Sequence, residues 1–513
     1  MARYRNPILP GFHPDPSICR VGHDYYLVVS SFEYFPGVPI FQSRDLTHWR
    51  QIGHCLSRDS QLPLVGLKSS DGIYAPTLRY HDGTFYMVTT NVRGTGNFYV
   101  TAHDPAGPWS EPVSLSGVPG IDPSLFFDDD GRVYLTRQGG GERGGIYQQE
   151  LDIERGAVVG EPRMIWSGTG GTWPEGPHLY KIAGRYYLMI AEGGTGYEHM
   201  ETIARSSSPW GPFEGCPHNP ILSHRERKEH PIQATGHADL VEAEDGAWWL
   251  VFLGIRPPDG EHHHLGRETF LAPVVWDEAG WPVINGTGTV ELELSAESLP
   301  PQEAPPAKPS RDDFTAPALG MDWNFVRNPD PASWSLSARP GWLRLSGSAT
   351  SLDDIGQPAL VGRRQEHLCC RASTLLAFDP LEDSELAGLV VRASEGNHYD
   401  LVLLGSGSNR RVELRTCVRG QREVIRVVPV PAGPVTLTID AEEEQYEFLC
   451  AGSDGATHSL GKRPTAPLSS EQASGFTGVY FGLYACSGRA GVRSGPADFD
   501  WFDYVPNAFE ARS

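Results

Sequence analysis

The apolar and polar positions of the first 290 residues follow one recurring arrangement. A turn precedes two residues that are mostly aromatic, and an apolar run follows them. The five copies are VGHDYYLVVS, YHDGTFYMVTT, DDDGRVYLT, IAGRYYLMI and EDGAWWLVFL, and the second residue of each pair is Tyr26, Tyr86, Tyr134, Tyr187 or Trp249. Asp-Gly between apolar runs signals a β-hairpin, and helical spacing is hard to find here. The pattern predicts an all-β five-bladed β-propeller over residues 1–300, with a long β-sandwich as the alternative.

The same repeat aligns a set of polar residues. Eleven or twelve residues before the five aromatics, the chain has Asp15, Ala75, Asp122, Glu175 and His237. If each copy is a blade, these positions lie at the start of the inner strand, where it borders the central channel. The sequence therefore predicts that three carboxylic acids and a histidine face one axis.

A second domain is predicted after a segment rich in proline and polar residues, residues 295–313, which is typical of a semi-rigid linker. Short alternating segments follow, among them LAGLVVRAS, HYDLVLLG, VTLTID and ADFDWFDYVP. They predict a concanavalin-like β-sandwich accessory domain over residues 311–513. It could be a carbohydrate-binding module or, as we prefer, a lid on the propeller. GVYFGLYACS is our candidate for the part that reaches the channel, and an ordinary core strand is its alternative.

Composition and net charge restrict the kinds of molecule that the protein is expected to bind. The formal net charge of −22 argues against nucleic acid and an anionic membrane, and it suits a neutral ligand such as a small oligosaccharide. A homo-oligomer is compatible with the sequence. The start of the chain lacks an apolar signal core, so we expect a cytoplasmic protein, although a chain trimmed of a signal would look the same. The eight cysteines show no metal-binding spacing and are interpreted as reduced core thiols.

Three carboxylic acids around one channel favour a particular chemistry. Glycoside hydrolysis uses one acid to protonate the leaving oxygen and one carboxylate to attack the sugar or to activate water. A third carboxylate nearby would hold the acid protonated near neutral pH. Taken singly, each residue could be a turn or capping residue, and it is their equivalent placement that favours catalysis.

Several motifs in order resemble glycoside hydrolase family 43, the five-bladed β-xylosidases and α-L-arabinofuranosidases. They are HPDPSI, SSFEYFPGVPIFQSRDLTHW, GIYAP, GIDPSLFFDDDG, WPEGPHLYK, AEGGTGYEHMETIARS and LGRET, and they span residues 5 to about 295. The resemblance implies an inverting mechanism in which Asp15 is the general base, Asp122 tunes and orients the acid, and Glu175 is the general acid.

The resemblance also implies residues that line the sugar site. Phe32 matches an aromatic wall of the first subsite, with a blade-core phenylalanine as its alternative. Tyr74, next to Ala75, stands where many β-xylosidase relatives carry Trp. Arg267 matches an arginine that hydrogen-bonds the bound sugar.

No cofactor is expected to be required. The histidine that matches His237 helps to hold a calcium ion through water in some members of the family, so calcium near His237 is one interpretation and a structural histidine is the other. The run 262–264, three consecutive histidines, is interpreted as a solvated loop, because neighbouring residues of a strand alternate faces.

The sequence thus predicts an inverting exo-glycosidase that releases terminal xylose from β-1,4-xylooligosaccharides and also acts on terminal α-L-arabinofuranosides. One alternative is an enzyme that is mainly an α-L-arabinofuranosidase. A retaining fructosidase lacks support, because its WMNDPNG-type motif is missing. A non-catalytic sugar-binding propeller is the alternative from another class.

Overall fold

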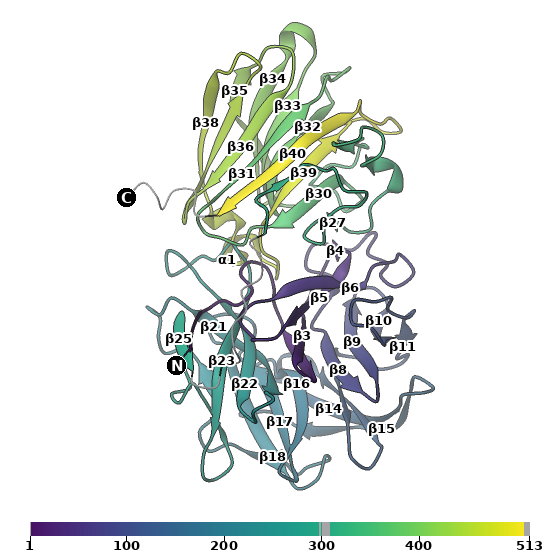
Figure 1. The fold of residues 1–513 in the computed structure, drawn as a ribbon, viewed down its shortest axis with the longest axis vertical. Helices are drawn as coiled ribbons and strands as arrows, with labels where there is room; N and C mark the ends of the chain where they lie inside the picture. The colour runs from purple at the N-terminus through teal and green to yellow at the C-terminus, as the bar shows by residue number, and fades with distance from the viewer. Residues whose placement is uncertain (1, 297–298, 300–307, 507–513) are drawn as a thin grey trace.

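The computed structural model of the chain describes residues 2–296, 299 and 308–506. Strands make up nearly all of the regular structure, and a β-sandwich lies against one end of a β-propeller (Figure 1). The predicted fold class is confirmed. None of the helices in the described part of the chain has the length and apolar character that crossing a bilayer requires.

Five antiparallel sheets form the propeller blades. Blade 1 contains β2 (Ser17–Val21), β3 (Asp24–Val28), β5 (Gly37–Ser43) and β6 (Arg50–Leu56). Blade 2 contains β7 (Gly72–Ile73), β8 (Thr77–His81), β9 (Thr84–Val92), β10 (Gly96–Ala102) and β11 (Val113–Ser114). Blade 3 contains β12 (Ile121–Phe127), β13 (Val133–Gly139), β14 (Gly145–Asp152), with η1 (Gly141–Arg143) before it, and β15 (Ala157–Trp166). Blade 4 contains β16 (Glu175–Ile182), β17 (Arg185–Glu192), β18 (Met200–Ser206), β19 (Glu214–Gly215) and β20 (Leu222–Ser223). Blade 5 contains β21 (Gln233–Glu242), β22 (Trp248–Ile255), β23 (Glu268–Trp276) and β24 (Pro282–Ile284). The five repeated aromatics lie in β3, β9, β13, β17 and β22, so each repeat is one blade.

The first residues of the chain pack along blade 5. Strand β1 (Ala2–Arg5) pairs with β25 (Glu293–Ala296). The Asn6 amide then exchanges hydrogen bonds with both backbone groups of Leu271, at 3.0 and 2.9 Å. These contacts join the beginning of the propeller to its last blade and fix blade 1 beside blade 5.

Two eight-stranded sheets form the sandwich. One contains β26 (Arg311–Asp312), β28 (Trp334–Ser335), β29 (Leu343–Leu345), β31 (Cys370–Ala377), β36 (Val435–Ala441), β37 (Gln445–Ala451), β38 (Thr457–Pro464) and β40 (Ala497–Pro506). The other contains, in spatial order, β35 (Gln421–Pro429), β34 (Arg411–Val418), β33 (Asn397–Leu404), β32 (Leu386–Ser394), β39 (Tyr480–Cys486), β30 (Ala359–Arg364), β27 (Asn324–Val326) and β4 (Tyr34–Phe35). The short helices are η2 (Pro331–Ser333), η3 (Gly407–Asn409), η4 (Ala466–Leu468) and α1 (Ser470–Ala473).

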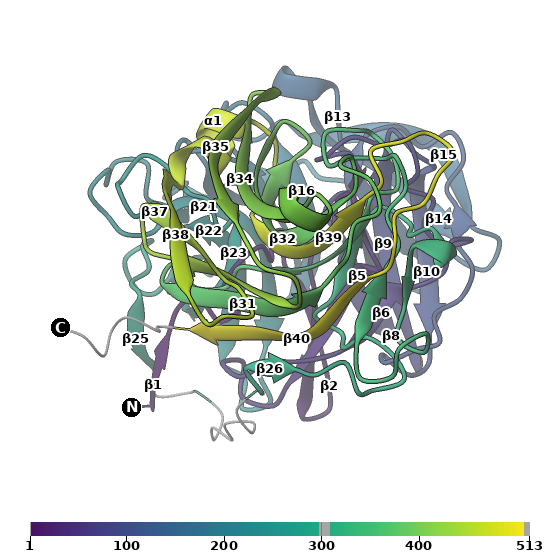
Figure 2. The ribbon, with the colours of Figure 1, turned by 90° about the horizontal axis from the view of Figure 1, so that it is seen from above.

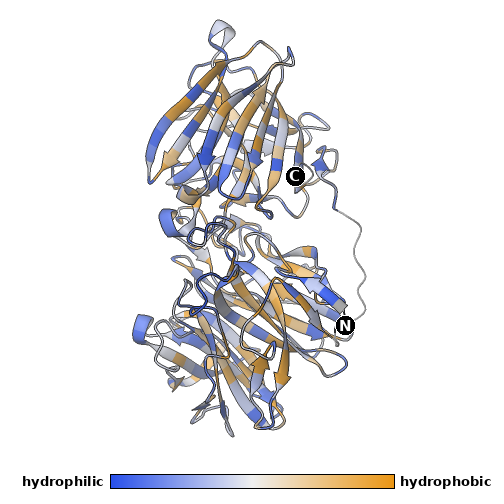
Figure 3. Cartoon of the chain, turned by 90° about the vertical axis from the view of Figure 1, so that its left-hand side faces the viewer, coloured by the Kyte–Doolittle hydropathy of each residue, from blue (hydrophilic) through white to orange (hydrophobic). Residues whose placement is uncertain are grey.

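Apolar residues from alternate strand positions fill the space between the two sandwich sheets. Figure 3 shows hydrophobic segments along the strands of both domains. No disulfide joins the cysteines of the described residues, and all of them except Cys369 are buried, as predicted for core thiols.

The predicted linker is partly regular. Its first residues end β25, and its last residues include β26, which pairs with β40. Residues 297–298 and 300–307 lie outside the described residues.

Strand β4 connects the two domains directly. It belongs to the propeller chain, between β3 and β5, yet it pairs with β27 at the edge of a sandwich sheet. The sandwich sheet with β32 and β39 lies over the propeller when the molecule is seen from above (Figure 2). The propeller segment around β4 is therefore held by the sandwich.

A buried ionic cluster joins the inner strands of four blades. The Asp239 carboxylate of blade 5 accepts hydrogen bonds from Ser17 Oγ at 2.7 Å, Arg79 Nη1 at 2.8 Å and Tyr180 Oη at 2.7 Å. Arg79 also contacts His178 Nδ1 at 2.9 Å. Since the Asp239 side chain is fully buried, these donors replace the water that it loses.

We predict that Asp239→Asn destabilises the propeller by about 3–5 kcal/mol, because it leaves the Arg79 guanidinium buried without its counter-ion. Arg79 and the other hydrogen-bond donors hold the pKa of Asp239 down at about 2, below the ordinary 3.8, despite the opposing effect of burial. The native state should therefore lose this contribution as the pH falls from about 4 toward 2. Urea unfolding followed against pH measures both effects.

The matched control is Asp130→Asn, which removes an exposed carboxylate 3.7 Å from Arg132 in the same domain. This variant should unfold within about 0.5 kcal/mol of the wild type. Equal stability of the Asp239 and Asp130 variants would contradict the role given to the buried cluster.

Candidate active site

A cavity of about 420 Å³ opens at the channel end that faces the sandwich. It contains every site residue that the sequence predicted: Asp15, Phe32, Tyr74, Ala75, Asp122, Glu175, His237 and Arg267. Ile121, Trp173, Gly194, Thr195 and Phe476 complete its lining. The equivalent positions of the repeat therefore meet in one place.

Irregular backbone at the starts of the inner strands aims these side chains at the axis. Asp15, Asp122 and His237 all have left-handed backbone, with φ of 55°, 53° and 48°. The pairing register also shifts between Ile121 and Ser124, between Glu175 and His178, and between Gly236 and Asp239. Non-glycine residues adopt such φ values at an energetic cost, and this local strain is typical of functional sites.

Both oxygens of the Asp15 carboxylate are held. Oδ1 accepts a hydrogen bond from Arg267 Nη1 at 2.8 Å, and Oδ2 accepts one from Ser30 Oγ at 2.5 Å. His237 Nδ1 lies 3.7 Å from Oδ1. The carboxylate is buried and has a fixed orientation toward the cavity, which suits a group that must orient one water molecule.

Glu175 is the group in the cavity best suited to remain protonated. Burial raises its pKa well above 4.5, and the neighbouring charges of Asp122 and Asp15 raise it further. Burial also raises the pKa of Asp122, to about 6, while His237 and the N–H of Gly176, 3.2 Å from Oδ2, act in the opposite direction. At neutral pH, Asp122 is thus mostly ionised, and its charge favours the protonated form of Glu175.

Three aromatic rings form one wall of the cavity. The rings of Phe32 and Tyr74 are 5.1 Å apart, and Phe476 stacks on Phe32 at 6.0 Å. The Arg267 guanidinium lies 5.6 Å from the centres of the Phe32 and Phe476 rings. Burial raises the pKa of Tyr74 to about 12, so its hydroxyl keeps its proton and can donate to a sugar. Ala75, the residue after Tyr74, has only a small side chain in the cavity lining.

Four lining residues of the propeller were missing from the sequence prediction, namely Ile121, Trp173, Gly194 and Thr195. Trp173 is 44% exposed at the cavity rim, and its backbone N–H donates to Glu142 O at 2.8 Å. Thr195 Oγ1 accepts a hydrogen bond from Arg267 Nη1 at 3.1 Å. Trp173 lies two residues before Glu175 in WPEGPH, and this proximity could have identified it; Thr195 has no comparable signal.

Phe476 is the contribution of the sandwich to the cavity. Its N–H donates to Ser70 Oγ at 2.8 Å, and its carbonyl accepts from Arg267 Nη2 at 3.4 Å. The chain then passes Gly478, where the Cα lies 2.9 Å from the Cβ that a side chain at Gly266 would carry. Glycine in LGRET, at φ 86°, is therefore required for this close approach.

The segment GVYFGLYACS does not itself line the cavity. Its residues 480–486 form β39, a fully buried strand, so the alternative interpretation as a core strand is correct. Its Tyr480 ring stacks on Tyr34 of β4 at 3.9 Å and packs against Phe12. The segment thus supports the site from behind, and the preceding loop supplies Phe476.

The prediction of a solvated loop at residues 262–264 is wrong. His263 and His264 are buried, because this loop contacts the sandwich. His263 Nδ1 lies 2.5 Å from Glu471 Oε1 of α1, and the carbonyl of His264 accepts the N–H of Val479 at 3.0 Å. Burial of these histidines therefore reflects a domain interface that the local sequence does not encode.

Calcium near His237 remains a prediction. Buried polar atoms of the neighbouring residues Glu201, His199 and Thr235 have no hydrogen-bond partner among the described residues. Glu201 Oε2 accepts the N–H of Ala238 at 3.2 Å, next to His237 in the chain. Carboxylate and hydroxyl oxygens are ligands that calcium accepts, directly or through water, so these residues fit such an ion.

The two domains match different family descriptions. The description Glycosyl hydrolases family 43 matches residues 4–282, and the description Beta xylosidase C-terminal Concanavalin A-like domain matches residues 311–505. A Bacteroides ovatus protein named non-reducing end alpha-L-arabinofuranosidase BoGH43B is 49% identical over 506 residues, which is 98% of this chain and 94% of that protein. A Butyrivibrio fibrisolvens protein named xylosidase/arabinosidase is 43% identical over 499 residues, 94% of this chain and 95% of that protein. The solved structure titled Bacteroides ovatus Xyloglucan PUL GH43B superposes with a TM-score of 0.94 at 48% identity, covering 98% of this chain and 100% of that one.

We predict that Asp122→Asn shifts the alkaline limb of the pH–activity profile to lower pH. Without the Asp122 charge, the pKa of Glu175 falls, so the acid loses its proton at a lower pH than in the wild type. The measurement is kcat/KM against pH on an aryl glycoside substrate, with Asp130→Asn as the control. An alkaline limb that stays in place would contradict the electrostatic role of Asp122.

Proposed function

Because the chain belongs to glycosyl hydrolase family 43, we propose that it is an inverting exo-glycosidase that removes terminal xylose from short β-1,4-xylooligosaccharides and terminal α-L-arabinofuranose from arabinofuranosides. The family match and the similar relatives both identify the chain as a glycoside hydrolase. The single observation that carries the proposed mechanism is that Glu175, whose pKa burial raises, shares one small cavity with the anchored Asp15 carboxylate.

Each of the three acids has one role in the proposed reaction. Glu175 donates its proton to the glycosidic oxygen as the bond to the leaving group breaks. Asp15 takes a proton from the water that attacks the anomeric carbon from the opposite face. Asp122, ionised and close to Glu175, keeps the acid protonated until the sugar arrives. The acid and base regain their starting states by proton exchange with solvent.

The other lining residues hold the sugar. Arg267 and the Tyr74 hydroxyl can donate to sugar hydroxyls, while the ring of Phe32 offers a flat apolar face to the sugar ring. Trp173, exposed at the rim, is placed to contact the part of the substrate that leaves. A small cavity closed on one side favours the end of a chain over its interior, which supports exo-action.

An enzyme that is mainly an α-L-arabinofuranosidase is the second candidate. The relative that is 49% identical carries that activity in its name, whereas the one that is 43% identical is named for both activities. Tyr74 adds a hydroxyl at the cavity wall that a tryptophan would lack, which can change the sugar that fits. The ratio of kcat/KM on aryl β-xyloside and aryl α-L-arabinofuranoside decides between the two candidates.

We further propose that the sandwich is a lid on the sugar site. Phe476 lies in the cavity wall, and the sandwich holds the β4 segment two residues after Phe32. The contact is reinforced by buried charge: Arg392 of β32 donates to Ser69 Oγ at 2.9 Å and lies 3.6 Å from Glu33 Oε1. A module tethered only by a linker would have none of these contacts.

We predict that Glu175→Gln lowers the rate of hydrolysis much more for one class of substrate than for another. Loss of the acid should almost abolish cleavage of xylobiose, whose leaving sugar needs a proton, but should spare aryl xylosides with a good leaving group far more. Steady-state kinetics on both substrates measures the difference. Equal losses on the two substrates would argue that Glu175 is not the acid.

Phe476 is 37% exposed, so a sugar in the cavity can cover part of its ring. Full burial of a phenylalanine is worth about 1.5–3 kcal/mol, and we predict that Phe476→Ala lowers kcat/KM on a one-sugar aryl glycoside by on the order of tenfold. Trp501→Ala is the control, since that sandwich residue lies on β40 and packs against Arg311. Wild-type kinetics in a folded Phe476→Ala protein would mean that the sandwich is not a lid.

A further inference from the structure

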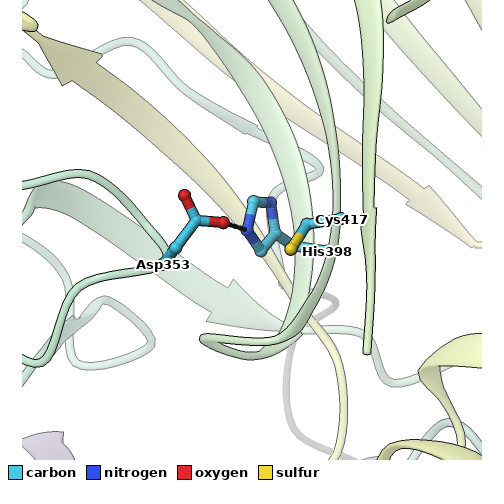
Figure 4. Close-up of side chains that lie close together, drawn as sticks. All are labelled: Asp353, His398 and Cys417. Atoms are coloured by element: carbon cyan, nitrogen blue, oxygen red, sulfur yellow. Dashed lines mark hydrogen bonds and ion pairs between the residues drawn. The ribbon is translucent and has the colours of Figure 1, made fainter. Parts of the chain in front are cut away.

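A second cluster of reactive side chains lies on the sandwich sheet, outside the sugar site. His398 of β33 and Cys417 of β34 are direct partners in the strand register, so their side chains project from the same face of the sheet. Asp353 reaches the same point from the segment between β29 and β30 (Figure 4). One oxygen, one nitrogen and one sulfur atom of these residues all lie within 4.8 Å of one another.

The arrangement of the histidine ring is typical of a metal ligand. His398 Nδ1 lies 2.7 Å from Asp400 Oδ1, and Nε2 lies 3.0 Å from Asp353 Oδ1. Histidines that bind metals commonly give one ring N–H to a carboxylate while the other nitrogen holds the ion. Here Asp400 is the orienting carboxylate, and Nε2 faces Asp353.

Asp353 is oriented in a similar way. Its Oδ2 atom forms an ion pair with Arg422 of β35, which also donates to Ser351 Oγ at 3.0 Å. Oδ1 is thereby turned toward His398. Each of the two polar ligands has one atom tied to an outer partner and one atom directed to a shared point.

We propose that Asp353 Oδ1, His398 Nε2 and Cys417 Sγ form a zinc-binding site in the sandwich domain. A set of carboxylate, imidazole and thiolate ligands suits Zn²⁺ and disfavours Ca²⁺ and Mg²⁺, which prefer oxygen ligands alone. Three protein ligands leave one tetrahedral position for solvent.

An open path leads to the ligands. A cavity of about 410 Å³ on this face is lined by all three of them, together with Tyr484 and Cys486 of β39. Binding would fasten the segment that carries Asp353 to β33 and β34. His398 is also the register partner of Arg392, which contacts the propeller, so the site would stiffen the strand that holds the lid.

The test is a titration of the full-length chain, freed of metal with a chelator, with Co²⁺ as a spectroscopic probe and Zn²⁺ as competitor. The wild type should develop a saturable thiolate-to-cobalt absorption band that Zn²⁺ abolishes, and Zn²⁺ should raise its Tm. Cys417→Ser should lose the band and the rise in Tm. Cys369→Ser, which removes a thiol elsewhere in the sandwich, should behave as the wild type.

Asp400→Asn provides an independent measurement that keeps all three ligands. It should retain the band but bind Zn²⁺ about 10- to 100-fold more weakly, because the orienting carboxylate is lost. A wild type without the band, a band that persists in Cys417→Ser, or unchanged Zn²⁺ affinity in Asp400→Asn would each overturn the proposal. None of these readouts depends on glycosidase activity.

Discussion

The buried Asp239 carboxylate fixes the geometry on which the site depends. Its hydrogen-bond donors come from blades 1, 2 and 4, and it belongs to blade 5 itself. The same inner strands continue within a few residues into the site: Ser17 follows Asp15 by two positions, as Asp239 follows His237. A shift of blade 1, 2, 4 or 5 that moved the reactive groups apart would also break this cluster. The propeller thus uses a buried ion pair, which is costly to expose, to hold acids that would otherwise repel one another.

The sandwich completes a cavity that the propeller alone leaves open. Phe32 is held from behind, because the next residues of its chain form β4 in a sandwich sheet. Phe476 extends the aromatic wall beside Phe32, and its backbone is hydrogen-bonded to Ser70 and Arg267 of the propeller. Arg267 therefore joins three parts of the molecule, since it contacts Asp15, the ring of Phe32 and the backbone of Phe476 in the sandwich. A small sugar pocket in this architecture is a property of both domains together.

The sequence allowed the propeller and the convergence of its acids to be predicted because both follow from a repeat. Asp15, Asp122, Glu175 and His237 occupy equivalent blade positions, and symmetry alone brings equivalent positions to one axis. Phe476 could not be found in this way. It lies in a loop more than 200 residues after Arg267, and no local sequence pattern marks it. Strand β4 has two residues, too few for a period of two to be recognised. In β39 both faces are buried, so alternation could not tell which side met the propeller.

The central claim is that Asp15 activates water on the face opposite the leaving group, while Glu175 protonates that group. The stereochemistry of the first product tests this most directly, because a base and a nucleophile at the position of Asp15 give opposite anomers. Proton NMR of a β-xyloside during the first minutes of hydrolysis resolves the two anomers before they equilibrate. The account predicts that α-xylose appears first. Initial β-xylose would mean that Asp15 attacks the sugar itself, and it would contradict the assignment of Asp15 as the base.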